Sequence, residues 1–190
     1  MAKSTAYGFT YRRNMRPGQK PATLEVILAN SATVAIGEAV KYSSGYLAAG
    51  AADAAILGIL VGIVTEKGEN VFKTKEAHGG TISGDDTFTA GSGNVTTQKV
   101  KGVVICDPDA LFQATNADAL TQAEVGLWFL GLANTNTGMD GTTGTGASWS
   151  VGTQDFQLIE LVTTEQDGSA VTDQGLFKIG RSQLLNDVTA

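Results

Sequence analysis

The chain has 190 residues, of which 42% are hydrophobic, so a single domain with its own core is expected. Charged residues make up only 17%, below the roughly 25% of ordinary globular proteins, and 24 glycines favour short strands joined by tight turns. One cysteine excludes an internal disulfide and a zinc site built from several cysteines. The most apolar stretch, residues 54–64, is shorter than the about 20 residues of a membrane span, and residues 1–15 lack the apolar stretch of a signal peptide. We therefore expect a soluble protein from a reducing compartment, without membrane contact.

Residues 1–22 are predicted to form an extended basic arm. Tyr7, Phe9 and Tyr11 alternate along it, a pattern typical of a strand-like segment laid into a groove on a partner. The alternative is that these aromatic side chains pack on their own domain. As a partner-binding arm, the segment would be removable without loss of the fold.

Charge is distributed unevenly between this arm and the rest of the chain. All the cations that precede the first acidic residue, Glu25, lie in the arm: Lys3, Arg12, Arg13, Arg16 and Lys20. The remaining residues hold 8 Lys and Arg against 19 Asp and Glu, a net charge of −11. A basic arm on an acidic body predicts docking on an acidic surface, unless the arm is only a solvated tail. We expect no direct contact with nucleic acid, because phosphates would repel the acidic body.

From residue 23 the sequence predicts strands and turns. Strands are expected over 23–30, 38–50 with a turn at Ser44-Gly45, 55–74 with a turn at Lys67-Gly68 and a second strand after it, and 79–107 with turns at Gly84-Asp85 and Gly91–Asn94. A short helix or a loop follows over 117–125. Residues 133–148 form a polar surface loop.

The C-terminal part predicts two more strands around a turn at Asp167-Gly168. In the first of them, Leu158, Glu160 and Val162 are expected on one face, and Ile159 and Leu161 on the other. We therefore predict an all-β domain over 23–190, a β-barrel or β-sandwich of jelly-roll or tulip-like type, with at most one short helix.

No residue pattern predicts catalysis, a cofactor or a metal, and we expect no enzymatic activity. His78, the only histidine, occurs in a turn setting without a nucleophile nearby in sequence, and we expect it at the surface. Asp107 and Asp109 flank Pro108, but the run lacks the glycine and distal glutamate of an EF-hand loop. A turn is the better interpretation, with Cys106 ending a buried strand as a small hydrophobe. A hydrolase that uses His78 or these aspartates is the remaining enzymatic alternative.

The order of several motifs resembles the small capsid cement, or decoration, proteins of tailed bacteriophages. The motifs are "AILGILVGIV" (55–64), "CDPDALFQA" (106–114), a polar Gly/Thr/Ser loop, "FQLIELV" (156–162) and "LFKIGRSQLL" (176–185). The resemblance covers roughly residues 23–188, and its most specific element is D-P-D-x-L-F. The arm lies outside it.

The resemblance implies a structural protein on the outer capsid surface of the virion, synthesised in the host cytoplasm. It would bind the major capsid protein as a homotrimer, clamp neighbouring coat subunits and stabilise the expanded head. The residues expected to bind coat, from charge and aromatic content, are Tyr7, Phe9, Tyr11, Arg12, Arg13 and Arg16. The residues expected at the trimer interface are Leu57, Ile59, Leu60 and Val61, or Trp128 and Phe129. The alternative is a head-fibre or adhesin module that binds host glycans through the 133–148 loop and Trp149.

Overall fold

A computed structural model describes residues 8–50, 55–74, 78–83, 87–97, 99–129, 156–162, 172–180 and 182–184. Most of these residues lie in antiparallel strands, which confirms the predicted all-β fold. The strands form two five-stranded sheets, A and B, and a three-stranded sheet C. The arrangement is sandwich-like and contains no closed barrel among the described strands.

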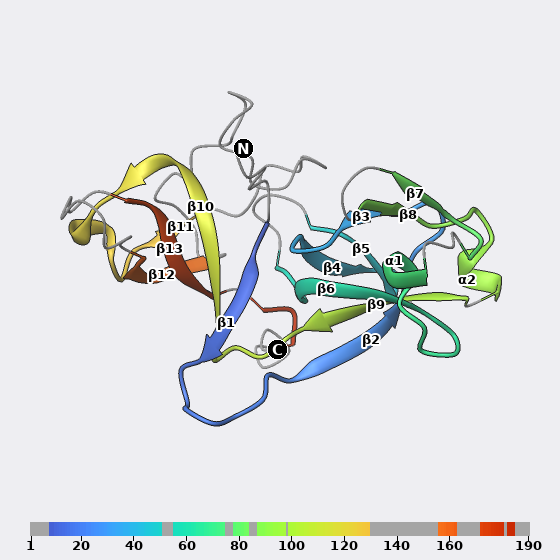
Figure 1. Cartoon of the computed structure of the whole chain (residues 1–190), viewed down its shortest axis with the longest axis horizontal. Coiled ribbons are helices and arrows are strands. Elements are labelled where there is room, and N and C mark those ends of the chain that lie inside the picture. The colour runs from blue at the N-terminus through green and yellow to red at the C-terminus, as the bar shows by residue number, and fades with distance from the viewer. Residues whose placement is uncertain are drawn as a thin grey trace.

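The three sheets draw their strands from different parts of the chain. Sheet A has the order β1 (Thr10–Asn14), β10 (Ala110–Leu120), β13 (Thr172–Ile179), β12 (Phe156–Leu161), β11 (Trp128–Phe129). Sheet B has the order β2 (Thr23–Ile27), β9 (Val100–Ile105), β6 (Gly58–Thr65), β4 (Ala39–Ser43), β5 (Tyr46–Ala49). Sheet C consists of β3 (Thr33–Ala35), β8 (Thr87–Thr89) and β7 (Thr81–Ser83). Figure 1 shows sheet A on one side of the molecule and sheets B and C on the other.

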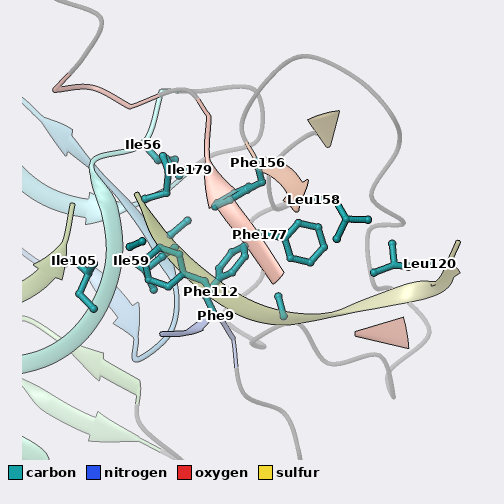
Figure 2. Close-up of a cluster of buried hydrophobic side chains, with 13 residues drawn as sticks. Phe9, Ile56, Ile59, Ile105, Phe112, Leu120, Phe156, Leu158, Phe177 and Ile179 are labelled. Carbon is teal, nitrogen blue, oxygen red and sulfur yellow. The ribbon is translucent and has the colours of Figure 1, made fainter. Parts of the chain in front are cut away.

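Two hydrophobic cores hold these sheets together. Core 1 joins sheet A to the near part of sheet B and contains Phe9, Ala39, Ile56, Ile59, Ile105, Ala110, Phe112, Ala114, Leu120, Phe156, Leu158, Phe177 and Ile179 (Figure 2). Core 2 lies between sheets B and C and contains Val26, Leu28, Val34, Val40, Leu47, Leu57, Leu60, Ile63, Val71, Phe88, Ala90, Val100 and Val104. β6 contributes to both cores, which explains its almost unbroken apolar sequence.

Sheet B curls strongly but does not close. Just past the end of β2, Leu28 forms a single bridge to Leu47 in β5, and the Ala29 N–H donates to the Leu47 carbonyl over 2.8 Å. Gly102 lies at the inside of the curl, where an added Cβ would collide with Leu47 and Leu60. The missing side chain therefore lets the two ends of the sheet approach each other.

The predicted hairpin turn at Ser44-Gly45 is confirmed between β4 and β5. Both residues have positive φ, 51° and 84°, as a two-residue turn of type I′ requires. The predicted turns at Gly84-Asp85 and Asp167-Gly168 and the polar loop 133–148 lie outside the described residues.

The helices of the structure lie at positions other than the one predicted. Over 117–125, where a short helix or a loop was expected, β10 occupies the first four residues, and Leu120 pairs with Thr172 of β13. A 3₁₀ turn, Gln122–Glu124, follows. The predicted second strand after Lys67-Gly68 is instead helix α1 (Val71–Thr74). Its N-terminus is capped by Asn70, whose Oδ1 accepts the Lys73 N–H over 3.1 Å. A second four-residue helix, α2 (Asn94–Thr97), exceeds the one helix expected.

No helix among the described residues is long and apolar enough to span a membrane.

The face prediction for β12 fails at a bulge. The pairing register with β13 shifts between Leu158 and Glu160. Leu158 is consequently buried in core 1, whereas Glu160 lies on the opposite, outward face and is exposed. The sequence pattern alone cannot reveal such an extra residue.

Candidate functional site

The Cys106-Asp107-Pro108-Asp109 run is a turn that connects sheet B to sheet A. Asp107 Oδ1 accepts the Asp109 N–H over 2.9 Å, and the Ala110 N–H donates to the Asp107 carbonyl over 3.1 Å. Cys106 is 7% exposed, and burial raises the pKa of its thiol. The turn interpretation of this motif and the role of Cys106 as a small buried side chain are therefore confirmed.

The same aspartate also anchors a second connection between the two sheets. Asp107 Oδ2 accepts the Asn14 Nδ2 at 3.0 Å and the Ala22 N–H at 3.3 Å. Backbone bonds reinforce this contact, from the Met15 N–H to the Asp109 carbonyl at 2.8 Å and from the Cys106 N–H to the Ala22 carbonyl at 3.0 Å. Both ends of the loop between β1 and β2 are thereby fixed against the turn (Figure 1).

We call residues 12–20 the basic connection, because they bear four exposed cations: Arg12, Arg13, Arg16 and Lys20. Three of these cations contact the body. Arg12 Nε donates to Gln113 Oε1 at 2.6 Å, Arg13 pairs with Glu160 at 2.5 Å, and Arg16 Nε lies 3.0 Å from Asp109 Oδ2. Met15 is 48% exposed between them. The basic connection is thus accessible to a partner and held in place by the body.

The prediction of an extended arm separate from the body is wrong for the described residues. Thr10–Asn14 forms edge strand β1, paired with β10. Phe9 does not fill a groove on a partner, since it is 3% exposed and stacks on Phe156 with a centroid separation of 4.5 Å. Tyr11 is half-buried against core 1, and Tyr7 lies outside the described residues. Large apolar rings gain more from the aromatic core of their own domain than from water, so this segment belongs to the fold.

Three of the six predicted trimer-interface residues are buried within the domain. Leu57, Ile59 and Leu60 are fully buried in the two cores, because β6 is covered on both faces. Val61, at a bulge in β6, is 37% exposed and stays a candidate. Trp128 is half-buried, and the side chain of Phe129 is not among the described side chains.

The structure brings Trp128 and the basic connection onto one surface. We define the outer face of sheet A as the face turned away from core 1. Pairing places one residue from each strand in a single row across this face, in the order Arg13, Leu111, Lys178, Gln157, Trp128. The Lys178 Nζ lies 5.9 Å from the centroid of the Trp128 ring, a cation–π contact. Arg13 and Trp128, which are 115 positions apart in sequence, therefore lie in one row on the outer face of sheet A.

Polar contacts tie the outer face of sheet A together. Gln113, which receives the Arg12 bond, donates in turn to Gln174 Oε1 at 2.5 Å. The Arg13–Glu160 pair joins β1 to β12 across the two strands between them. Leu111 and Leu176, which neighbour Arg13 and Glu160 in the register on this face, are only 2% and 7% exposed.

His78 is half-buried and lines an open pocket of about 300 Å³ together with Thr65, Glu66, Gly79 and Lys99. Within the described ranges no three His, Cys, Asp or Glu side chains gather closely enough to hold a metal ion.

Comparison with known proteins finds no matching family model, no matching curated protein and no matching solved structure.

Proposed function

We propose that this protein is a structural cement of a tailed-phage head, which binds the major capsid protein on the outer capsid surface through the basic connection. The observation that carries the proposal is the exposure of Arg12 and Arg13 at the end of β1 and of Arg16 on the loop that follows, in an otherwise acidic chain. Both ends of that loop are fixed to the body. The motif resemblance supplies the coat lattice as the partner.

The charge distribution supports an acidic docking surface. The basic connection would approach coat carboxylates while the acidic remainder of the chain is repelled by them, so the protein would bind in one orientation. Arginine suits this role because its planar guanidinium forms two parallel bonds to a carboxylate. Met15 adds an apolar contact at the centre of the same loop.

The anchoring supports a role in resisting mechanical force. A clamp resists separation of coat subunits only if force on its binding loop passes into the folded body. Asp107 binds Asn14 and Ala22, at the two ends of the loop between β1 and β2, and so ties this loop to the turn between the sheets. Core 1 joins the sheets themselves. Binding at many lattice positions, in trimers as we propose, would make modest single contacts collectively strong.

The first test is quantitative mass spectrometry of purified particles from the source of the chain. We expect a copy number equal to that of the coat protein or a simple fraction of it. A few copies would indicate a tail or fibre component, and absence from particles would refute the proposal.

The second test measures binding to particles that lack the protein. Replacing Arg12, Arg13 and Arg16 together with glutamine should weaken binding at least about 100-fold, since interface arginines commonly contribute 1 kcal/mol or more each. The matched control replaces Lys67, Lys73 and Lys99, exposed lysines on the sheet B side, and changes the net charge equally. Equal binding by the two triple variants would contradict the assignment.

A further inference from the structure

We propose that the outer face of sheet A is a second contact surface for the same partner, and that the surface it meets is acidic with an apolar group beside it. This inference rests on the proposed function. It extends the footprint from the basic connection across all five strands of sheet A to Trp128.

Charge complementarity defines the partner. The described side chains on this face include the cations Arg12, Arg13 and Lys178 but one anion, Glu160, which Arg13 already pairs. The face is therefore a local positive region on a chain whose net charge is −6. An acidic protein surface fits it better than a second copy of this acidic chain.

The register sets the spacing that the partner must match. Arg13 and Lys178 are two strands apart in the row, about 10 Å at the usual strand separation of about 4.8 Å. Trp128 lies a further two strands away, so its ring forms the far end of the row, beside Leu127, which is 38% exposed. The partner should present carboxylates about 10 Å apart and an apolar group beyond the second.

Size and continuity favour one footprint over two separate sites. Four strand spacings by the length of β1 give a face of about 19 by 17 Å, or about 320 Å². A standard interface covers about 800 Å² on each partner, so this face alone is too small. Arg12 and Arg13 belong both to this face and to the basic connection, so the two surfaces form one continuous footprint that is larger than either alone.

The experiment compares single variants in the particle-binding assay. Lys178→Gln should weaken binding about tenfold and Trp128→Ala by at least as much. The matched control is Lys101→Gln, because Lys101 is also a half-exposed lysine in an interior strand, paired with Glu25 at 3.8 Å. Replacing Trp149 with Phe leaves Trp128 as the only tryptophan, and its fluorescence should change on binding.

The outcomes separate this inference from the proposed function. If Lys178→Gln and Trp128→Ala bind normally and the arginine variants do not, the second contact is refuted and the proposed function stands. Failure of the unmodified chain to bind particles would overturn both. Thermal melting of Trp128→Ala is measured in parallel, to detect any loss of the fold. The second contact is also refuted if Lys178→Gln binds normally and the fluorescence of Trp128 does not change when the chain binds particles. If the free chain self-associates and Trp128→Ala abolishes this, the partner is a second copy and the proposed acidic surface is wrong.

Discussion

Replacing Glu38 with glutamine should stabilise the protein at pH 8 and have little effect near pH 4. Glu38 precedes β4 at the junction of sheets B and C, and its Oε2 accepts the Ala35 N–H over 2.8 Å. Burial raises the pKa of its carboxyl group from 4.5 to about 7, although the bond from Ala35 acts in the opposite direction. The folded protein therefore favours the neutral carboxyl group.

The sign and the size follow from linkage. Below pH 4.5 the carboxyl group is protonated in both states, and its full contribution to stability is present. As the pH rises through 7, the unfolded chain has already lost the proton that the folded chain still holds, and this contribution is lost. The shift corresponds to at most about 3 kcal/mol, at about 1.4 kcal/mol for each pKa unit. Glutamine keeps an acceptor for the Ala35 N–H and carries no charge at any pH.

The assay is urea unfolding of the native chain and of Glu38→Gln at pH 4.5, 6 and 8. The difference in unfolding free energy between the two should grow with pH and level off above about 7. Glu66→Gln, an exposed glutamate, serves as the control for the general effect of removing one negative charge. A difference between native and Glu38→Gln that is constant across the three pH values would refute the reasoning.

Three further perturbations test the fold that supports the site. Phe9→Ala should lower the unfolding free energy by about 3–5 kcal/mol in urea, and native-like stability would contradict its place in core 1. Asp107→Ala should lower stability by about 2–3 kcal/mol and speed tryptic cleavage within the basic connection, whereas Asp109→Ala, which removes an exposed ion pair, should change both far less. Gly58→Ala should lower the melting temperature strongly, because the new Cβ would collide with the Ile105 carbonyl, and an unchanged melting temperature would show that β9 can move away.

The sequence correctly predicted the features that depend on interactions between neighbouring residues, namely turns and short strands. The turn at Ser44-Gly45 and the turn after Cys106 were predicted because glycine, aspartate and proline act on their own backbone. The all-β class followed from many short β-branched segments between such turns. Helix α1 was missed because four residues are too few to show a helical period, and its signal was the single cap residue Asn70.

Predictions that depended on pairing between distant segments failed. Residues 117–125 favour a short helix or a loop by sequence, yet β10 extends into the first four of them, where Leu120 pairs with Thr172 of β13. The aromatic side chains at the N-terminus were assigned to a partner, but core 1 accepts Phe9 from a position 103 residues before Phe112. Periodicity reports that a side chain is apolar on one face, and it does not report which surface that face meets.

The candidate site shows the same difference between local signals and contacts between distant segments. The distribution of charge along the sequence identified Arg12, Arg13 and Arg16, because it can be counted without knowledge of the structure. It could not show that Asp107 anchors the loop after β1, since Asn14 and Asp107 are 93 residues apart and no sequence pattern links the two. In this structure the D-P-D motif forms the turn that anchors the loop after β1, and it thereby fixes the position of these cations. The function that we propose requires this coupling, because a binding loop that moved independently of both sheets would transmit no force between the subunits that the protein would join.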